Sequence, residues 1–300
     1  MKIITVTLNP CIDVNYDIYE PFLPGKLYRV EEPAVSYNGK GINVSRTLRA
    51  LGEESVCLTV YGGQGELEGA LRKEGLTTYG VSCRGKLRHN IAVLDCEGSQ
   101  TQINEPGMRL SDEEMREFCG IFKSELNCKD KCAAVICGSL PPGADSSFYR
   151  KLVSVAKGAG AYTVLDCDGE ALKLGVEATP DLIKPNLSEF CKLTGTKIAG
   201  GGEELRIDAV RAALEFYRNE ECAVLCTLGE DGSVYAGPEG SYMCQAVSCK
   251  VKNFKGAGDS FLAAFILEHI VREKDCDISM MLASREASRH MSGQNCVYFR

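Results

Sequence analysis

Short apolar runs alternate with segments of helical periodicity along most of the chain. The strand-like runs are ITVTL, SVCLTVYG, AAVICG, YTVLD, DLIKPN and AVLCTLG, and the helix-like segments that follow most of them include INVSRTLRAL, GELEGALRKEG, SSFYRKLVSVAKGAG and LSEFCKLTG. Strands with nearly continuous apolar residues are typical of parallel sheets that are buried on both faces. The order therefore predicts an α/β fold, with helices on both faces of a mostly parallel sheet and ligands beyond the carboxyl ends of its strands.

Two segments depart from this alternation. Residues 13–37 and 87–104 alternate apolar and polar positions and contain Pro-Gly and Glu-Gly turns, which is typical of hairpins. Because both flank βα units at the predicted ligand end, we interpret them as a small β lid inserted into a core made of residues 1–12, 38–86 and 105–300. The alternative is that they form extra strands at the edge of the main sheet.

Composition narrows the possible partners and location. The 34 basic and 41 acidic residues give a net charge of −7, and there is no long basic run, so a nucleic-acid partner is not expected. No apolar stretch approaches the ~20 residues that span a bilayer, so no membrane association is expected. The first residues, MKIITVTLNP, are better suited to a strand than to a signal peptide, and we expect a cytoplasmic protein.

The chain has sixteen cysteines, which we interpret as reduced thiols rather than a disulfide framework. Cys222 and Cys226 lie in the apolar run ECAVLCTLG, where a spacing of four places both on one face of a strand. Small buried side chains are favoured there over a zinc site.

The stretch KGAGDSFLAAF places a glycine-rich turn directly before an apolar helix. At such a helix start, the backbone amides of Gly256, Ala257 and Gly258 are free to converge on an anion. Asp259 in the first turn has two possible roles. It could cap the helix, or it could act as a general base that takes a proton from an attacking hydroxyl.

Two further segments offer polar groups at helix starts. Gly39, Lys40, Gly41 and Asn43 lie at a loop-to-helix junction, where backbone can approach a polyol and Asn43 can bind its hydroxyls. In LIKPNLSEF, Asn186 and Glu189 are three apart, a spacing that suits either a hydrated Mg²⁺ ion or a helix N-cap with an exposed acid.

A weaker signal favours a different enzyme class. Gly63, Gly65 and Gly69 approximate a dinucleotide-binding turn, but the last glycine is one position late, and a plain βα turn explains them. An NAD-dependent oxidoreductase therefore stays an alternative.

Taken in order along nearly the whole chain, the motifs resemble those of the ribokinase-like, PfkB-type carbohydrate kinases. The matching segments are TLNPCIDVNYDI, NGKGINVSRTLRALG, TQINEPG, ICGSLPPG, LDCDGEALKLG, LIKPNLSEF, TLGEDGS and NFKGAGDSFLAAF. GKGINVSR, GSLPPG, LDCDGEAL and the NEPG segment are most similar to the hexose-phosphate branch, which includes 1-phosphofructokinase and tagatose-6-phosphate kinase.

The resemblance implies a three-layer αβα sandwich with a small β lid, a homodimer formed through that lid, and Mg²⁺-dependent transfer of the ATP γ-phosphate to a sugar hydroxyl. It makes Asp259 the catalytic base and Gly256, Ala257 and Gly258 the anion hole. Further residues match positions of three kinds: Asn186 and Glu189 for Mg²⁺ through water; Lys184, Thr227 and Gly229, with Asn186, for the nucleotide; Asp13, Gly39 and Asn43 for sugar hydroxyls.

A phosphate already present on the sugar requires cations, and the matching segments supply Lys40, Arg88, Lys26 and Arg29. We therefore expect a sugar-phosphate kinase, with fructose 1-phosphate the first substrate and tagatose 6-phosphate and fructose 6-phosphate the alternatives. A non-catalytic sugar-phosphate sensor is a more remote one. Phe254 and Lys255 stand where the family usually has a neutral pair, which places a positive charge beside the anion hole. Lys255 could help to bind ATP or could point to solvent.

Overall fold

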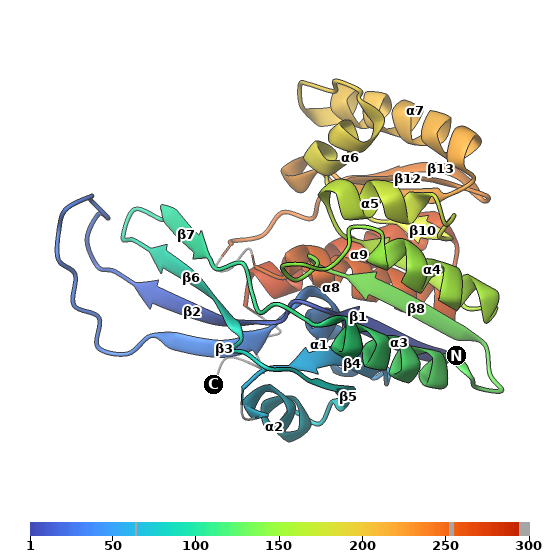
Figure 1. Ribbon diagram of the computed structural model, residues 1–300. Helices are drawn as coiled ribbons and strands as arrows, with labels where there is room; N and C mark the ends of the chain where they lie inside the picture. Colours follow the sequence, from blue (N-terminus) through green and yellow to red (C-terminus); the bar gives the residue numbers. More distant parts are fainter. Residues whose placement is uncertain (64, 252–254, 294–300) are drawn as a thin grey trace.

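The computed structural model describes residues 1–63, 65–251 and 255–293. Within these residues the chain forms a nine-stranded sheet (Figure 1). In spatial order its strands are β13 (Gly240–Cys244), β12 (Ser233–Gly237), β11 (Ala223–Thr227), β10 (Leu182–Ile183), β9 (Tyr162–Asp166), β8 (Cys132–Cys137), β1 (Lys2–Thr7), β4 (Val56–Tyr61) and β5 (Thr77–Ser82). From β11 to β5 all neighbours are parallel, and only β12 and β13 pair antiparallel, which confirms the mostly parallel sheet.

Helices cover both faces of this sheet. One core cluster contains residues from α2 (Glu66–Lys73), α3 (Asp112–Leu126), α4 (Phe148–Gly158), α5 (Gly169–Val176), α6 (Leu187–Thr194) and α7 (Gly202–Glu220). The other contains residues from α1 (Lys40–Ala50), α8 (Ala257–Phe265), its π-helical continuation (Ile266–Val271) and α9 (Cys276–Met291). Ile4 and Val6 of β1 enter the first cluster and Ile3 enters the second, because successive strand side chains alternate between faces. The three-layer αβα architecture is confirmed.

Two long helices were not among the predicted elements. α7 and α9 are mixtures of charged and small apolar residues, with Ala209 and Ala213 of α7 and Ala283 of α9 fully buried. Alanine gives a weaker apolar stripe than leucine or valine, so the helical period is less visible in the sequence. The helices α7 and α9 are evident only from the tertiary structure.

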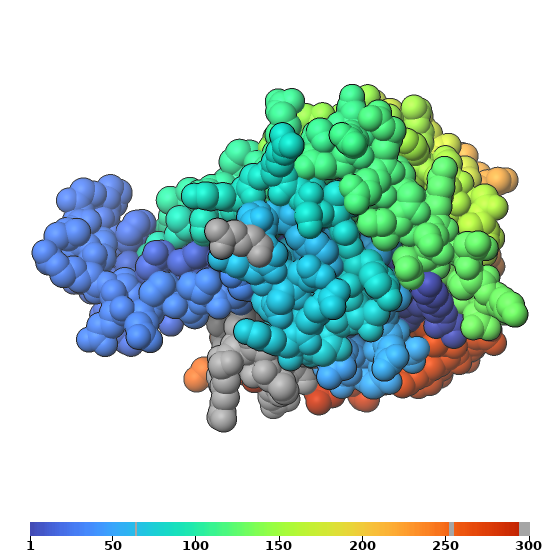
Figure 2. All heavy atoms as spheres, turned by 60° about the horizontal axis from the view of Figure 1, so that its bottom comes forward, coloured from blue at the N-terminus to red at the C-terminus, as the bar shows by residue number. Residues whose placement is uncertain are grey.

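A second sheet in the described part of the chain has four strands, in the order β3 (Ala34–Asn38), β2 (Cys11–Asp17), β6 (Arg88–Leu94) and β7 (Gln100–Asn104). It projects from the body of the molecule, and the segment between β2 and β3 reaches farthest out (Figures 1 and 2). It forms a separate sheet rather than an extension of the main sheet's edge. We call it the lid sheet, and its function as a lid stays a prediction.

The strand registers divide the lid sheet into two different faces. One row across all four strands is polar, and it consists of Ser36, Asp13, Asn90 and Asn104. The next row points to the opposite face and is apolar, and it consists of Val35, Val14, Ile91 and Ile103. We call these the polar row and the apolar row.

The cysteines of the described segments are free thiols, and Cys222 and Cys226 are buried in the core, as their spacing on the strand predicted. None of the helices within these segments has the length and apolar character needed to cross a bilayer.

Candidate active site

Asp259 lies in the first turn of α8, where the chain enters the helix through Gly256. Gly256 has φ of +81°, a left-handed conformation that favours glycine. The backbone amides of Asp259 and Ser260 are the first in the turn to donate a hydrogen bond, and both donate to the Gly256 carbonyl. The amides of Ala257 and Gly258 precede them at the positive end of the helix. This geometry suits an anion at the N-terminus of α8.

The Asp259 carboxylate does not cap its own helix. It is 7% exposed, and its Oδ2 accepts a hydrogen bond of 2.9 Å from the side-chain amide of Asn43, at the start of α1. The capping interpretation of Asp259 is therefore wrong for this structure. Instead, the loop-to-helix junctions of α1 and α8 come together and direct an amide and a carboxylate at each other.

Glycines allow α1 to start close to the central strand β1. A Cβ atom at Gly39 would lie 2.5 Å from Thr7 Cγ2, and one at Gly41 would lie 2.5 Å from the carbonyl oxygen of Val6. Neither glycine has a left-handed backbone conformation. The close approach of β1, rather than backbone conformation, therefore requires glycine at both positions. This packing places Lys40 and Asn43 at the carboxyl end of β1.

A buried carboxylate at the end of β9 holds the two lysines of the site. Asp166 is fully buried, with Oδ1 2.9 Å from Lys40 Nζ and Oδ2 3.1 Å from Lys184 Nζ. Lys184 follows β10, and its Nζ would be 3.8 Å from a Cβ atom placed on Gly258. The structure thus brings the predicted Lys40 and Lys184 together beside the anion-binding turn.

Burial and neighbouring charges shift the pKa values of the two buried acids, Asp166 and Asp259, in opposite directions. Burial raises the pKa of Asp166, but the adjacent Lys184 and Lys40 outweigh it and hold that pKa below its usual value. Burial raises the pKa of Asp259, as does the negative charge of Asp166, and these effects exceed the opposing ones of Lys40 and the Asn43 amide. Asp166 also raises the pKa of Lys40, so that lysine stays charged. A carboxyl with a raised pKa is a stronger base when ionised, which suits proton abstraction.

Asn186 and Glu189 form a reciprocal capping box at the start of α6. The Glu189 amide donates to Asn186 Oδ1 at 2.9 Å, and the Asn186 amide donates to Glu189 Oε2 at 2.8 Å. The helix-cap interpretation is thus correct, and the Mg²⁺ role stays a prediction. Both side chains border a cleft of about 520 Å³ between α5 and α6. Among the described residues no three His, Cys, Asp or Glu side chains form a metal-binding group.

The other predicted nucleotide residues follow the neighbouring strand. Thr227 ends β11 and its amide donates to the Pro185 carbonyl at 3.0 Å, which ties it to the start of α6. Gly229 is exposed, with φ of +64°, at the start of a short 3₁₀ turn (Gly229–Asp231). Both lie at the carboxyl edge of the sheet, near Lys184 and Asn186.

The lid sheet supplies Asp13 and Arg88 to the same region. Asp13 is 8% exposed and accepts a hydrogen bond of 2.8 Å from the Asn38 amide. Arg88 pairs in register with Cys11 on the adjacent strand, and its Nε atom is buried without a hydrogen-bond partner. Both side chains belong to the polar face of the lid sheet.

Lys26 and Arg29 lie elsewhere. They belong to the segment between β2 and β3 that projects in Figure 2, and both residues are exposed by their accessible surface. Lys26 Nζ lies 2.5 Å from Glu20 Oε2, within the same segment. Within one chain, the structure does not bring these two cations to the Asp259 region.

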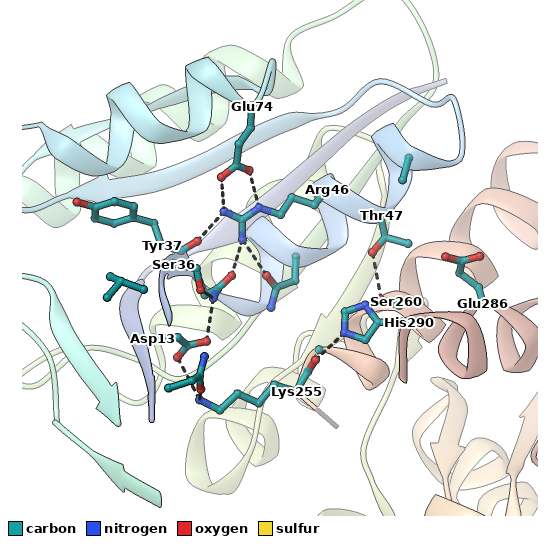
Figure 3. Close-up of a pocket in the computed structure, with 16 residues that line it drawn as sticks. Asp13, Ser36, Tyr37, Arg46, Thr47, Glu74, Lys255, Ser260, Glu286 and His290 are labelled. Atoms are coloured by element: carbon teal, nitrogen blue, oxygen red, sulfur yellow. Dashed lines mark hydrogen bonds and ion pairs between the residues drawn. The ribbon is translucent and has the colours of Figure 1, made fainter. Parts of the chain in front are cut away.

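Arg46 of α1 links the two halves of the site and was missed by the sequence interpretation. Its guanidinium makes ion pairs with Glu74, donates to the Tyr37 carbonyl and to Asn38 Oδ1, and lies 3.2 Å from Asn43 Oδ1 (Figure 3). Asn38 in turn binds Asp13, and Asn43 binds Asp259. An arginine three positions after Asn43, on the buried side of a helix, is the signal that could have revealed it.

A cavity of about 180 Å³ lies beneath the polar face of the lid sheet and is bordered by Arg46 and its partners Asn38 and Asn43 (Figure 3). Its lining includes Asp13, Asn38, Asn43, Lys255 and Gly256. Lys255 directly precedes the anion-binding turn, and its side chain points to the lid sheet (Figure 3). Phe254, its partner in the unusual pair, lies outside the described residues.

A buried carboxylate, a helix start with free amides, and two lysines paired with Asp166 lie together at the carboxyl edge of an αβα sheet, an arrangement typical of the kinase class of group-transfer enzymes. Within that class the chain belongs to the pfkB family of carbohydrate kinases, whose model matches residues 6–296. It is a carbohydrate kinase, and the NAD-dependent alternative has no support from the family.

Individual relatives agree with this assignment. Tagatose-6-phosphate kinase from Staphylococcus epidermidis is 31% identical over 279 residues, which cover 91% of this chain and 87% of that protein. The structure of phosphofructokinase-2 from Escherichia coli in complex with fructose-6-phosphate matches with a TM-score of 0.88 and 25% identity, covering 99% and 97% of the two chains. A possible 1-phosphofructokinase from Thermotoga maritima matches with a TM-score of 0.80 and 26% identity, covering 97% and 92%.

Proposed function

We propose that the chain is a Mg²⁺- and ATP-dependent sugar-phosphate kinase, with fructose 1-phosphate as the preferred acceptor and fructose 1,6-bisphosphate as the product. Tagatose 6-phosphate and fructose 6-phosphate are the alternative acceptors, since relatives with those names or ligands are similar to this chain. The single observation on which the reaction rests is the Asp259 carboxylate, held 2.9 Å from Asn43 at the start of α8.

In the proposed reaction Asp259 accepts the proton of the acceptor hydroxyl as that oxygen forms a bond to the γ-phosphorus. The bond between the γ-phosphorus and the bridging oxygen breaks, and ADP leaves with the electron pair. Gly256, Ala257 and Gly258 form the anion hole, where backbone amides stabilise the charge that develops on the transferred group. Lys40 and Lys184 add positive charge beside it, and both remain paired with Asp166. We therefore propose Lys40 for the transferred phosphate rather than for the phosphate of the acceptor.

The acceptor would be held from the lid side. Asp13, Gly39 and Asn43 would bind its hydroxyls, because Asp13 and Asn43 border one cavity and Gly39 starts the helix that carries Asn43. Arg88, whose buried Nε atom has no hydrogen-bond partner, would bind its phosphate. Lys26 and Arg29 project away from their own cavity, so we propose that they act in an assembled dimer.

The nucleotide would lie along Lys184, Asn186, Thr227 and Gly229. Asn186 and Glu189 fit a hydrated Mg²⁺ ion, because their capping bond uses Glu189 Oε2 and a carboxylate has a second oxygen that can face water. The ion, when bound, neutralises charge on the phosphates. These residues border the cleft of about 520 Å³ beside α5.

We also propose a homodimer formed through the lid sheet. Two members of the apolar row are strongly exposed, Val35 at 57% and Ile103 at 61%. A row of apolar side chains across a whole sheet face is costly in water, and a second copy that packs on it would remove that cost. The same assembly would bring the projecting segment of one chain close to its partner.

Release of ADP from Mg²⁺-ATP tests the function directly. The acceptors would be fructose 1-phosphate, tagatose 6-phosphate, fructose 6-phosphate, and free fructose and tagatose. We expect turnover of a phosphorylated ketose with kcat/KM at least tenfold above the free sugars. Turnover of the free sugars alone would contradict the proposal, and tight binding of a sugar phosphate without ADP release would favour the non-catalytic sensor.

A further inference from the structure

Lys255 has a fixed backbone position beside the anion-binding turn. It directly precedes Gly256, and its carbonyl oxygen lies 2.6 Å from Nε2 of His290 on α9. Because a carbonyl only accepts, the imidazole is the donor in this bond. The contact ties the start of α8 to α9, so the Lys255 side chain starts from a well-defined point.

From that point the Lys255 side chain points away from α8 and toward the lid sheet (Figure 3). Its Nζ atom lies 3.6 Å from Asp13 Oδ1 and 3.3 Å from Asn15 Oδ1, on the same face of β2. The side chains are largely buried, at 23% exposure for Lys255 and 12% for Asp13. The ammonium group therefore bridges the core and the polar face of the lid sheet, at the residue proposed to hold acceptor hydroxyls.

A second cation lies on the neighbouring strand of the lid sheet. Arg88 begins β6 in register with Cys11, and the thiol of Cys11 is in contact with Asp13. Burial and the Asp13 charge raise the pKa of that thiol to about 12, whereas Arg88 and Lys255 act on it in the opposite sense. Both cations thus act on Cys11, but only Lys255 borders the cavity; Arg88 begins the strand that pairs with β2.

We propose that Lys255 is a specificity-determining residue whose ammonium group, together with Arg88, binds the anionic group of a phosphorylated acceptor. An acceptor whose hydroxyls bind Asp13 would bring its phosphate near a carboxylate, and a cation beside that carboxylate offsets the repulsion. A free sugar carries no such charge and gains little from Lys255. This inference rests on the proposed function and adds a residue to its acceptor site.

Steady-state kinetics of charge variants test the inference. Lys255→Met keeps the length of the side chain and removes its charge, and Lys255→Arg keeps the charge. For Lys255→Met we expect the KM for the sugar phosphate to rise about tenfold or more, with kcat and the KM for ATP changed less than about threefold. The kcat/KM for the free sugar should hardly change, so that discrimination between the two acceptors narrows. Lys255→Arg should recover most of the affinity.

Lys129→Met serves as the control, because this exposed lysine follows α3 and lies before β8, at the opposite edge of the sheet from the site. It should leave all these constants unchanged. Should Lys255→Met unfold, Lys255→Gln replaces it, since its amide can still bind Asp13 while carrying no charge. Thermal unfolding identifies which variants are folded.

The outcomes separate the two proposals. If the unmodified protein phosphorylates no sugar phosphate, the proposed function fails and this inference with it. If it does so and folded neutral variants keep the same KM for the sugar phosphate, Lys255 alone is misassigned. A rise in the KM for ATP, or an equal loss on phosphorylated and free sugars, would also overturn the acceptor role.

Discussion

The two sheets of this protein have the same alternation of side chains but use it differently. In the nine-stranded sheet both faces enter apolar cores, and polar side chains such as Asp166 lie at the carboxyl edge. In the lid sheet the alternation separates the polar row, which faces the site, from the apolar row, which faces outward. The core sheet therefore places the proposed catalytic groups at an edge, whereas the lid sheet presents the proposed acceptor-binding groups on a face.

This difference explains why the proposed catalytic groups and the proposed acceptor-binding groups come from different sheets. A parallel sheet covered by helices leaves only its strand ends free for chemistry, so catalysis depends on helix starts and strand ends. A sheet with one open face can contact an acceptor with several strands at once. We infer that mutations at the core edge change mainly kcat, and mutations on the lid change acceptor affinity or assembly.

The largest effect is expected for Asp259→Asn. Turnover should fall by about 10² to 10⁴, because the amide cannot accept the proton, while both substrates still bind. Measurement of kcat and of substrate binding by calorimetry checks this.

The same substitution should change stability. Since burial raises the pKa of Asp259 in the folded state, ionisation of this carboxyl lowers the free energy of unfolding as the pH rises above the unfolded pKa. The variant should therefore melt at a higher temperature near neutral pH.

The matched control is Asp112→Asn, an exposed acid in the first turn of α3. It should leave turnover unchanged. The rate of the unmodified enzyme should also fall as the pH is lowered through the raised pKa of Asp259. Near-normal turnover of Asp259→Asn would end the assignment of this residue as the base.

A second test breaks the connection between the two sheets. Arg46→Met removes the guanidinium from Glu74, Asn38 and Asn43, and loss of one partner from a buried ion pair costs about 3 kcal/mol. We expect the free energy of unfolding in urea to drop by about that amount. Because Asn38 and Asn43 hold Asp13 and Asp259, kcat should fall and the acceptor KM should rise together.

Arg46→Lys keeps a charge but not the planar fork, and it should recover only part of both losses. Arg49→Met, in the same helix but exposed, is the control. Loss of stability with unchanged kinetics would show that Arg46 stabilises the fold without positioning the site.

The third test concerns the outer face of the lid sheet. Ile103→Asp places a charge in the apolar row and should weaken the proposed dimer at least tenfold, about 1.4 kcal/mol. Analytical ultracentrifugation over a range of concentrations measures this, with Ile103→Thr as a milder β-branched control. If the unmodified protein is monomeric at all concentrations, the lid-mediated dimer is wrong.

The smallest effects are expected from the capping boxes at the starts of α3 and α6. Ser111→Ala and Asn186→Ala each remove a side-chain cap, of α3 and α6, and each should cost about 1 kcal/mol of stability. Only Asn186→Ala should also raise the Mg²⁺ concentration needed for half-maximal rate. An equal Mg²⁺ requirement in both variants would reduce Asn186 to a structural cap.

Much of the fold could be predicted from local patterns. The apolar runs identified β1, β4, β8, β9, β10 and β11 of the central sheet, whereas β5, β12 and β13 were not among them. The glycines before Lys40 and Asp259 identified both helix starts of the site. The helices α7 and α9 were missed, because their buried alanines give a weak apolar stripe.

Local patterns could not decide between alternative roles of single residues. A first-turn acid is a cap in most helices, yet Asp259 turns to Asn43, while Glu189 at a similar position does cap its helix. The direction of Asp259 depends on α1 packing against α8, which no window of sequence around residue 259 contains. For the same reason Arg46 and Asp166 received no role, and the role of Lys255 was left open between ATP binding and a side chain in solvent.

The sequence alone determined most of the elements near the site, because helical and strand periods and glycine conformations act over a few neighbouring residues. Only the tertiary structure decided which elements meet. Asn43 and Asp259 are 216 positions apart, Lys40 and Asp166 are 126 apart, and Lys255 and Asn15 are 240 apart. Such pairs depend on strand order, sheet register and helix packing, which arise from the burial of the whole chain rather than from any one segment.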